Sequence, residues 1–170
     1  GELMASDAEK TVEEILSRST DGLMGTSFDC LCGRRHEIPM KYLSIKKEAV
    51  ADVADRLFDL GISGNGGLVY DRKIENIVVK GIKQVLTGGG LGLFDYPVGD
   101  GIEKIPPEID RAVSLSKRID AGIDYLVSVG SGVVSDLTKK ASDLLGLPYI
   151  LIATAPSMNG YTSSMAALTE

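Results

Sequence analysis

The chain has 170 residues, 44% of them hydrophobic, and a formal net charge of −6, values that fit one ordinary globular domain with a core of its own. The acidic balance argues against a nucleic-acid partner, which would need a basic stripe to neutralise its phosphates. No apolar run is as long as a membrane helix and the acidic start has no signal-peptide core, so we expect a soluble, cytoplasmic protein with no membrane partner.

The first 36 residues are predicted to form a separate N-terminal segment. Residues 6–17 show the apolar spacing of an amphipathic helix with Ser6 at its N-cap. The sequence then loses its periodicity and enters a loop that contains both cysteines of the chain. We expect residues 1–36 to pack as an arm beside a larger domain that spans residues 37–170.

The loop of this segment brings two thiols and the only imidazole of the chain close together in sequence. Cys30, Cys32 and His36 lie within seven positions and could bind zinc, with Asp29 or Glu37 as a fourth ligand. Structural zinc sites, however, prefer two to four residues between paired cysteines and a full tetrahedral ligand set. The spacing therefore favours thiols and a loop histidine that hold no metal.

From residue 37 onward, apolar runs of strand length alternate with helical patterns. The predicted strands are 42–45, 67–71, 91–96, 125–129 and 149–154, and the predicted helices are 46–60, 73–86 and 106–119, with one more between Gly132 and Gly146. Since most strands are followed by a helix, the sequence predicts an α/β fold, a Rossmann-like doubly wound parallel sheet. The glycine run 88–90 follows a helix instead of a strand, and we interpret it as a flexible connection.

The strongest local signal is the glycine turn after the apolar run 125–129. Gly130-Ser131-Gly132 lets the main chain approach a phosphate, and the amides of the following helix would point at the anion. The run matches the dinucleotide fingerprint G-x-G-x-x-G except for Ser135 in the place of the third glycine. The fingerprint also expects an acidic residue at the end of the next strand, where this chain has Thr154.

Two aspartates have both a functional and a structural interpretation. Asp71 ends a predicted strand, where a carboxylate can accept the ribose hydroxyls of a nucleotide or cap the following helix. Asp136 lies three residues before Lys139, a spacing typical of a stabilising pair on a helix surface. The residues alone leave both alternatives open at each position.

Two motifs at a defined separation resemble one known family. The first, G-S-G-x-x-x-D-x-x-K, spans residues 130–139, and the second, T-A-P-S-x-N-G-Y-T-S, spans residues 154–163. Together they resemble the sn-glycerol-1-phosphate dehydrogenases of the iron-containing alcohol dehydrogenase and dehydroquinate synthase-like superfamily. The resemblance implies a dehydroquinate synthase-like N-terminal domain that binds NAD or NADP, with a polyol phosphate as substrate.

The resemblance also implies a role for particular residues. The pyrophosphate would bind at the glycine turn, formed by Gly130, Ser131, Gly132, Val133 and Val134. The rest of the cofactor would be lined by residues of the second motif, Thr154, Ala155, Pro156, Ser157 and Ser163. Asp71 would bind the ribose, and Asp136 would lie near the nicotinamide or ribose. Asn159 stands where the family usually has an aspartate that contacts the polyol, so this contact keeps a hydrogen bond but loses the charge.

The same family implies a metal that this chain is not expected to hold. There, zinc, nickel or iron is bound by an aspartate and two histidines, and the histidines come from a helical second domain that we expect to be absent here. Our first hypothesis is therefore the NAD(P)-binding portion of a polyol-phosphate oxidoreductase, inactive alone because the metal ligands are missing. The alternatives are a free-standing nucleotide-binding or regulatory module without redox activity, and a structural subunit that pairs with a separate catalytic half. As protein partners we expect either further copies of the chain, in a homo-oligomer, or that catalytic half.

Overall fold

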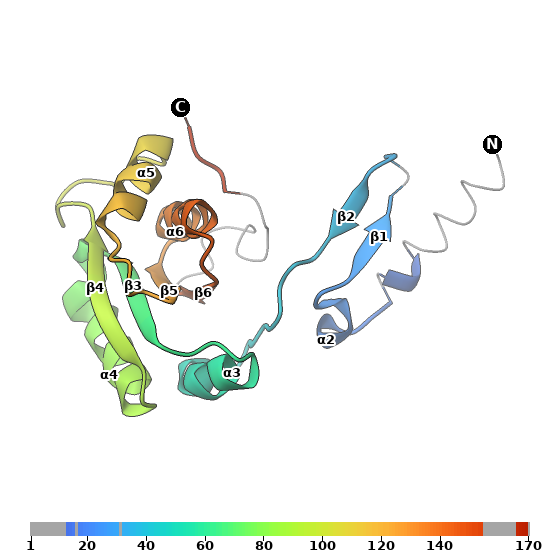
Figure 1. Ribbon diagram of the computed structural model, residues 1–170, viewed down its shortest axis with the longest axis horizontal. Helices are drawn as coiled ribbons and strands as arrows, with labels where there is room; N and C mark the ends of the chain where they lie inside the picture. Colours follow the sequence, from blue (N-terminus) through green and yellow to red (C-terminus); the bar gives the residue numbers. More distant parts are fainter. Residues whose placement is uncertain (1–12, 16, 31, 155–165, 170) are drawn as a thin grey trace. The chain divides into compact units, whose positions relative to one another are not determined.

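The computed structural model describes residues 13–15, 17–30, 32–154 and 166–169 (Figure 1). The chain divides into two compact units, Gly1–Ile45 and Lys46–Glu170. The sequence suggested a boundary after residue 36, a position that lies inside the second strand of the N-terminal unit. No helix in the described part of the chain is long and apolar enough to span a bilayer.

The N-terminal unit contains a short helix and a β-hairpin. Helix α2 is Thr20–Leu23, and strands β1, Ser27–Asp29, and β2, Arg35–Glu37, pair antiparallel. Ser27 lies opposite Glu37, and Phe28 lies opposite His36. None of the described residues of this unit is buried, so the hairpin has no apolar core of its own.

Two predictions concern the chain around this hairpin. The predicted helix 6–17 falls largely outside the described residues, and of its described positions residues 13–15 are helical. The predicted strand 42–45 is wrong, because that stretch belongs to neither sheet. A run this short becomes a strand only when a neighbouring strand pairs with its backbone groups.

The C-terminal unit is built on a parallel sheet whose strands are β3, Asn65–Asp71, β4, Gly92–Val98, β5, Tyr125–Gly130, and β6, Tyr149–Ala153. Their order across the sheet is β4-β3-β5-β6, and all neighbours are parallel. The chain therefore winds from β3 outward to β4, crosses back to β5 on the other side of β3, and continues outward to β6. This is the doubly wound α/β fold that the sequence predicted.

Helices connect these strands, and some begin differently from the predictions. The elements are η1, Ala49–Asp52, α3, Val53–Asp59, η2, Arg72–Ile74, η3, Glu75–Val79, α4, Lys80–Gly88, α5, Ile109–Arg118, and α6, Gly132–Leu145. The predicted helix 46–60 starts later and opens with a 3-10 turn. The predicted helix 73–86 is helical throughout but passes from a 3-10 turn through a π-helical segment into α4.

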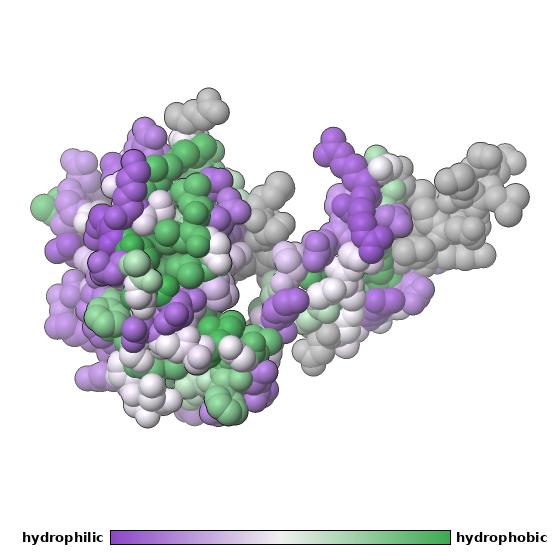
Figure 2. Space-filling model, in the orientation of Figure 1, coloured by the Kyte–Doolittle hydropathy of each residue, from purple (hydrophilic) through white to green (hydrophobic). Residues whose placement is uncertain are grey.

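The sheet has an apolar core on each face. On one face, α5 and α6 pack against alternate residues of the strands, with Val69, Leu126 and Leu137 in the same buried cluster. On the other, Leu57 of α3 and Leu86 of α4 pack against the remaining strand residues, Leu68, Tyr70, Tyr125, Val127 and Val129. Figure 1 shows α5 and α6 together on one side of the sheet and α4 on the other. In Figure 2, hydrophobic residues gather on the visible face of this unit.

Strand β4 is an outer strand of the sheet and contains a proline. Pro97 has no backbone N–H, so it is compatible with an edge position. Its carbonyl accepts two hydrogen bonds from the guanidinium of Arg118, at 3.3 and 3.2 Å. These bonds tie the last turn of α5 to the edge of the sheet.

The buried phenol of Tyr70 predicts a loss of stability at high pH. Burial, reinforced by the carboxylates of Asp95 and Glu75, raises the pKa of Tyr70 from 10.0 to about 12. Between these pH values unfolding releases a proton from Tyr70. The stability that depends on this group is therefore fully present below pH 10, and the free energy of unfolding falls as the pH rises toward 12. We expect urea unfolding across this range to show a shallower fall for Tyr70→Phe than for the wild type, and equal slopes would contradict this assignment.

Candidate functional site

The turn between β5 and α6 has a backbone conformation that requires glycine. Gly130 has φ +149°, a value that residues with a side chain rarely adopt. A Cβ added there would lie 3.4 Å from the side chain of Val134 and 3.7 Å from that of Ile74. The turn is therefore close-packed on its inner side, while Ser131, the next residue, is exposed.

The first amides of α6 have no acceptor among the described residues. Ser131 is the N-cap residue in an extended conformation, and its side chain makes no cap hydrogen bond. The first bond of the helix runs from the N–H of Ser135 to the carbonyl of Ser131, at 3.0 Å. The N–H groups of Gly132, Val133 and Val134 consequently have no acceptor inside the helix. No acidic residue lies in the first turn, so the positive end of the helix dipole is not neutralised there.

This turn lies at the point of the sheet where open α/β proteins bind ligands. The connections that leave β3 and β5 run to opposite sides, which makes the gap between these two strands the topological switch point. Tyr70 pairs with Val129, so the next residues, Asp71 and Gly130, end neighbouring strands at the same edge. The structure thus brings together the two predicted elements of the nucleotide site, the strand-end carboxylate and the glycine turn.

Asp71 fits both of its interpretations. Its Oδ1 accepts a hydrogen bond from the N–H of Lys73 at 2.9 Å and so caps the short helix η2. In the described part of the chain, its Oδ2 makes no hydrogen bond. The capping bond fixes the orientation of the carboxylate and leaves one oxygen to accept a hydroxyl.

The end of strand β6 lies next to the glycine turn. The N–H of Thr154 donates to the carbonyl of Gly130 at 3.5 Å, so the second motif starts beside the first. The remaining predicted residues of this motif, Ala155, Pro156, Ser157, Asn159 and Ser163, lie outside the described residues. Their roles therefore stay predictions.

Asp136 and Lys139 form a buried pair, and their interpretation as a surface pair is wrong. The Lys139 Nζ and Asp136 Oδ1 atoms are 3.6 Å apart, and the two side chains are 3% and 8% exposed. Oδ1 of Asp136 makes no hydrogen bond among the described residues. The carboxylate also acts on Tyr149, since burial and then the charge of Asp136 raise the pKa of that phenol.

Two further features of this edge were not predicted. Ser128 is fully buried two residues before Gly130, and its Oγ has no hydrogen-bond partner among the described residues. The sequence could have indicated this position, because Ser128 is a polar residue inside an otherwise apolar predicted strand.

The loop after β4 borders a cavity of about 310 Å³ lined by Gly99, Asp100, Glu103, Lys104, Ile105, Pro106 and Arg111. A Cβ added at Gly99 would lie 3.8 Å from Asp71 Oδ1, so this cavity adjoins the strand-end carboxylate.

These features define a Rossmann-like α/β domain with a glycine turn at its switch point. The crystal structure of sulfoacetaldehyde reductase from Bifidobacterium kashiwanohense in complex with NAD+ has this fold, with a TM-score of 0.53 at 14% identity over 65% of this chain and 33% of that chain. The chain belongs to the iron-containing alcohol dehydrogenase family, whose model matches residues 44–170. The resemblance drawn from the two motifs is confirmed.

Curated relatives lie within the same family. The glycerol-1-phosphate dehydrogenase (NAD(P)+) of Geobacillus thermodenitrificans is 41% identical over an alignment of 165 positions that covers 90% of this chain and 38% of that protein. The protein of the same name from Methanothrix thermoacetophila is 30% identical over 120 residues, 71% of this chain and 32% of that protein. The chain therefore spans about a third of the length of the curated relatives that it matches.

Proposed function

We propose that this chain binds NAD(P) at the carboxyl edge of its sheet and is the cofactor-binding portion of a polyol-phosphate dehydrogenase. The observation that carries the proposal is the juxtaposition of Asp71 with the uncapped amides of α6 at the switch point. The names of the curated relatives, glycerol-1-phosphate dehydrogenase (NAD(P)+), support the nucleotide and the substrate class.

Each part of the cofactor has a place along this edge. The pyrophosphate accepts hydrogen bonds from the amides of residues 132–134, where the helix dipole favours an anion. Asp71 accepts a ribose hydroxyl, and the adjoining cavity after β4 receives the adenosine end. The second motif, from Thr154 to Ser163, lines the rest of the cofactor, and Asn159 hydrogen-bonds the polyol.

The buried carboxylate of Asp136 belongs to the nicotinamide side of this arrangement. It lies one turn into α6, beyond the amides that bind the pyrophosphate, and its Oδ1 has no hydrogen-bond donor among the described residues. Lys139 compensates the charge of this carboxylate at 3.6 Å, but an oxygen buried without a hydrogen bond still gains stability from a donor. The ribose hydroxyls or the carboxamide of the nicotinamide nucleoside would supply one.

We expect hydride transfer only in a protein as long as the curated relatives, because the metal ligands would come from parts that this chain does not contain. The family resemblance implies a metal held by an aspartate and two histidines, and this chain contains a single histidine, His36. The chain alone therefore lacks the ligands for such a centre, which would polarise the alcohol. We expect the chain to bind the nucleotide without oxidising the polyol phosphate.

Calorimetric titration of the chain with NADH and NADPH tests the cofactor site. Asp71→Ala should weaken NADH binding by about 1–3 kcal/mol, the range for a lost hydrogen bond to a charged group. The matched control is Asp143→Ala, which removes an exposed carboxylate from the opposite end of α6 and should leave the affinity unchanged. Equal affinities of Asp71→Ala and the wild type would remove Asp71 from the site.

One observation favours a second candidate, a nucleotide-binding module without redox activity. Asn159 replaces the aspartate that the family uses at the polyol, and the uncharged amide weakens the case for the usual substrate. Titration with ATP and AMP in parallel separates the candidates. Tighter binding of either mononucleotide than of NADH and NADPH would support the module and contradict the dehydrogenase.

A further inference from the structure

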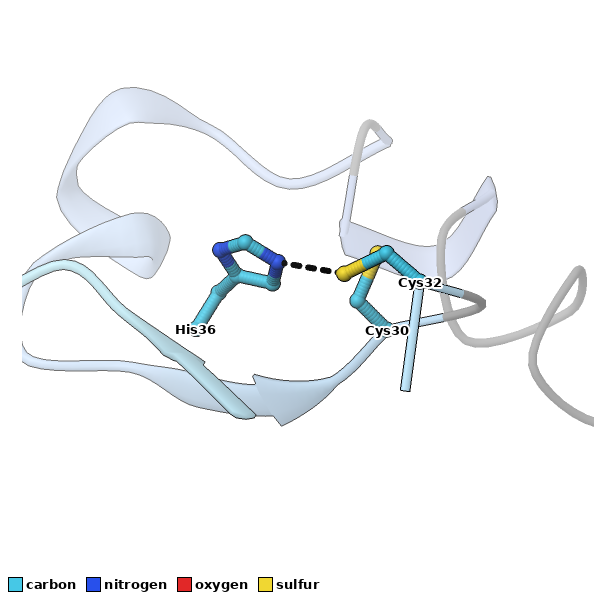
Figure 3. Close-up of side chains that lie close together, drawn as sticks. All are labelled: Cys30, Cys32 and His36. Atoms are coloured by element: carbon cyan, nitrogen blue, oxygen red, sulfur yellow. Dashed lines mark hydrogen bonds between the residues drawn. The ribbon is translucent and has the colours of Figure 1, made fainter. Parts of the chain in front are cut away.

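Three side chains of types that can ligate a metal lie together at the turn end of the N-terminal hairpin. Between β1 and β2, the N–H of Cys30 donates to the carbonyl of Arg34, and the N–H of Gly33 donates to the carbonyl of Cys30, both at 2.9 Å. Gly33 has φ +78°, the left-handed conformation that closes this tight turn. The strand register then returns His36 to a position opposite Phe28, beside the turn. Figure 3 shows both sulfur atoms on the side of the turn that faces the imidazole.

The distances among these side chains are close to those of a tetrahedral metal site. Cys30 Sγ, Cys32 Sγ and a ring nitrogen of His36 all lie within 4.8 Å of one another. The Sγ of Cys32 and the Nε2 of His36 are 3.1 Å apart. Zinc bonds of about 2.3 Å to sulfur and about 2.0 Å to nitrogen place two sulfurs about 3.8 Å apart and a sulfur and a nitrogen about 3.5 Å apart. Small side-chain rotations therefore suffice to place one ion between all three.

We propose that Cys30, Cys32 and His36 bind one zinc ion, with water in the fourth position. Thiolate and imidazole ligands select zinc over magnesium, calcium and manganese, which prefer oxygen. Two thiols lose their protons to the solvent as two zinc–sulfur bonds form, while the imidazole binds as the neutral ring. Asp29 is not part of the set, since the ligand atoms that lie within 4.8 Å of one another are those of Cys30, Cys32 and His36 alone among the described residues, and its carboxylate faces the guanidinium of Arg35 at 3.6 Å.

The surroundings of the cluster explain what the ion does. A two-stranded hairpin is marginally stable in water, and the described residues of this unit provide no buried apolar side chain. Much of the hairpin surface visible in Figure 2 is hydrophilic. The ring of Phe28 stacks on that of His36 with centroids 5.6 Å apart, which restricts the imidazole to the orientation that faces the sulfurs. The ion thus supplies the stabilisation that small units without a core obtain from metals.

This site differs from the metal centre expected for the family. That centre needs two histidines, whereas the hairpin uses the single histidine of the chain together with both of its cysteines. The proposal also reverses the expectation drawn from the cysteine spacing. The pairing of β1 with β2 places His36 near the two cysteines, and the spacing of the cysteines along the chain gives no information about this pairing.

Titration with Co2+ tests the proposal on the intact 170-residue chain. After treatment with a chelator, and with a phosphine reductant present, we expect one Co2+ to bind with thiolate charge-transfer bands and the visible bands of a tetrahedral ion, and Zn2+ to displace it. Cys32→Ser should weaken Zn2+ binding at least about 100-fold, because the loss of an outer-shell partner alone costs up to that factor. Glu37→Gln is the matched control and should bind as the wild type does, because Glu37 is not in the cluster and, as the next residue of β2, points to the face opposite His36.

Proteolysis gives a second readout that does not depend on a variant. Arg34 and Arg35 are exposed and lie inside the proposed chelate ring, so Zn2+ should slow tryptic cleavage after them in the wild type and not in Cys32→Ser. Three results would overturn the proposal. They are no binding of Co2+ to the reduced chain, binding without thiolate bands, and formation of a Cys30–Cys32 disulfide that Zn2+ does not prevent.

Discussion

Replacing Gly130 with alanine is expected to abolish measurable binding of NADH. At φ +149° a side chain is strained by about 1–3 kcal/mol, although the added Cβ would meet Val134 only in ordinary contact at 3.4 Å. The turn relieves this strain by moving away from its present path. The amides of residues 132–134 then lose their alignment with the pyrophosphate, and calorimetry should show no heat of binding at concentrations that saturate the wild type.

The opposite end of the same helix provides the control for this variant. Gly146, the C-cap of α6, also has a positive φ, +67°, but nothing lies within 4 Å of an added Cβ. Gly146→Ala should therefore lower the free energy of unfolding modestly and leave the affinity for NADH as it is. An intact affinity in Gly130→Ala would show that the dinucleotide does not use this turn.

Leu137→Ala should be the most destabilising single truncation in α6. Leu137 is 1% exposed and packs in the core between this helix and the sheet. The loss of a fully buried leucine side chain costs about 2–5 kcal/mol, depending on how far the cavity collapses. Urea unfolding followed by circular dichroism should show a lower midpoint with an unchanged slope.

Leu144 lies on the same helix and makes a matched comparison. It is 48% exposed, so Leu144→Ala makes the same chemical change at nearly the same helix propensity with little loss of packing. The difference between the two variants measures burial alone. If both lose the same free energy of unfolding, the position of α6 against the sheet is wrong.

The sheet and the edge that carries the candidate site could be predicted from the sequence, because both depend on local signals. The run 125–129 is apolar and ends in glycine, and the structure places β5 there with the turn at its carboxyl end. Parallel strands that alternate with helices have few possible arrangements, so the order of the elements indicated which edge would hold the site. Asp71 and Gly130 were predicted as parts of that edge, and the strand register confirms that they end neighbouring strands.

The surroundings of α6 could not be predicted in the same way. Residues 134–139 are all buried, the polar ones included, so this helix has no solvent-exposed face over that stretch. The spacing of Asp136 and Lys139 therefore indicated a surface pair, although tertiary packing covers both side chains. Burial on several sides depends on which elements neighbour the helix, and periodicity along the chain does not contain that information.

The hairpin cluster shows the same limitation at the N-terminus. The spacing rule for zinc counts residues along the chain, and one residue between Cys30 and Cys32 argued against a metal. The distance from Cys32 to His36 depends on how β1 and β2 pair, and this register is set by contacts such as Phe28 with His36. The three proposed ligands could have been recognised from the sequence only after the pairing of β1 with β2 had been predicted.

The proline of β4 affects how this domain behaves at high concentration. An open sheet exposes the backbone groups of its outer strands, and a second molecule can add a strand there, which is a common start of aggregation. At Pro97 the missing N–H removes one donor, and the guanidinium of Arg118 occupies the carbonyl of the same residue. A strand of a second molecule could form no backbone hydrogen bond with either the nitrogen or the carbonyl of Pro97. Strand addition at this point of the β4 edge is therefore disfavoured.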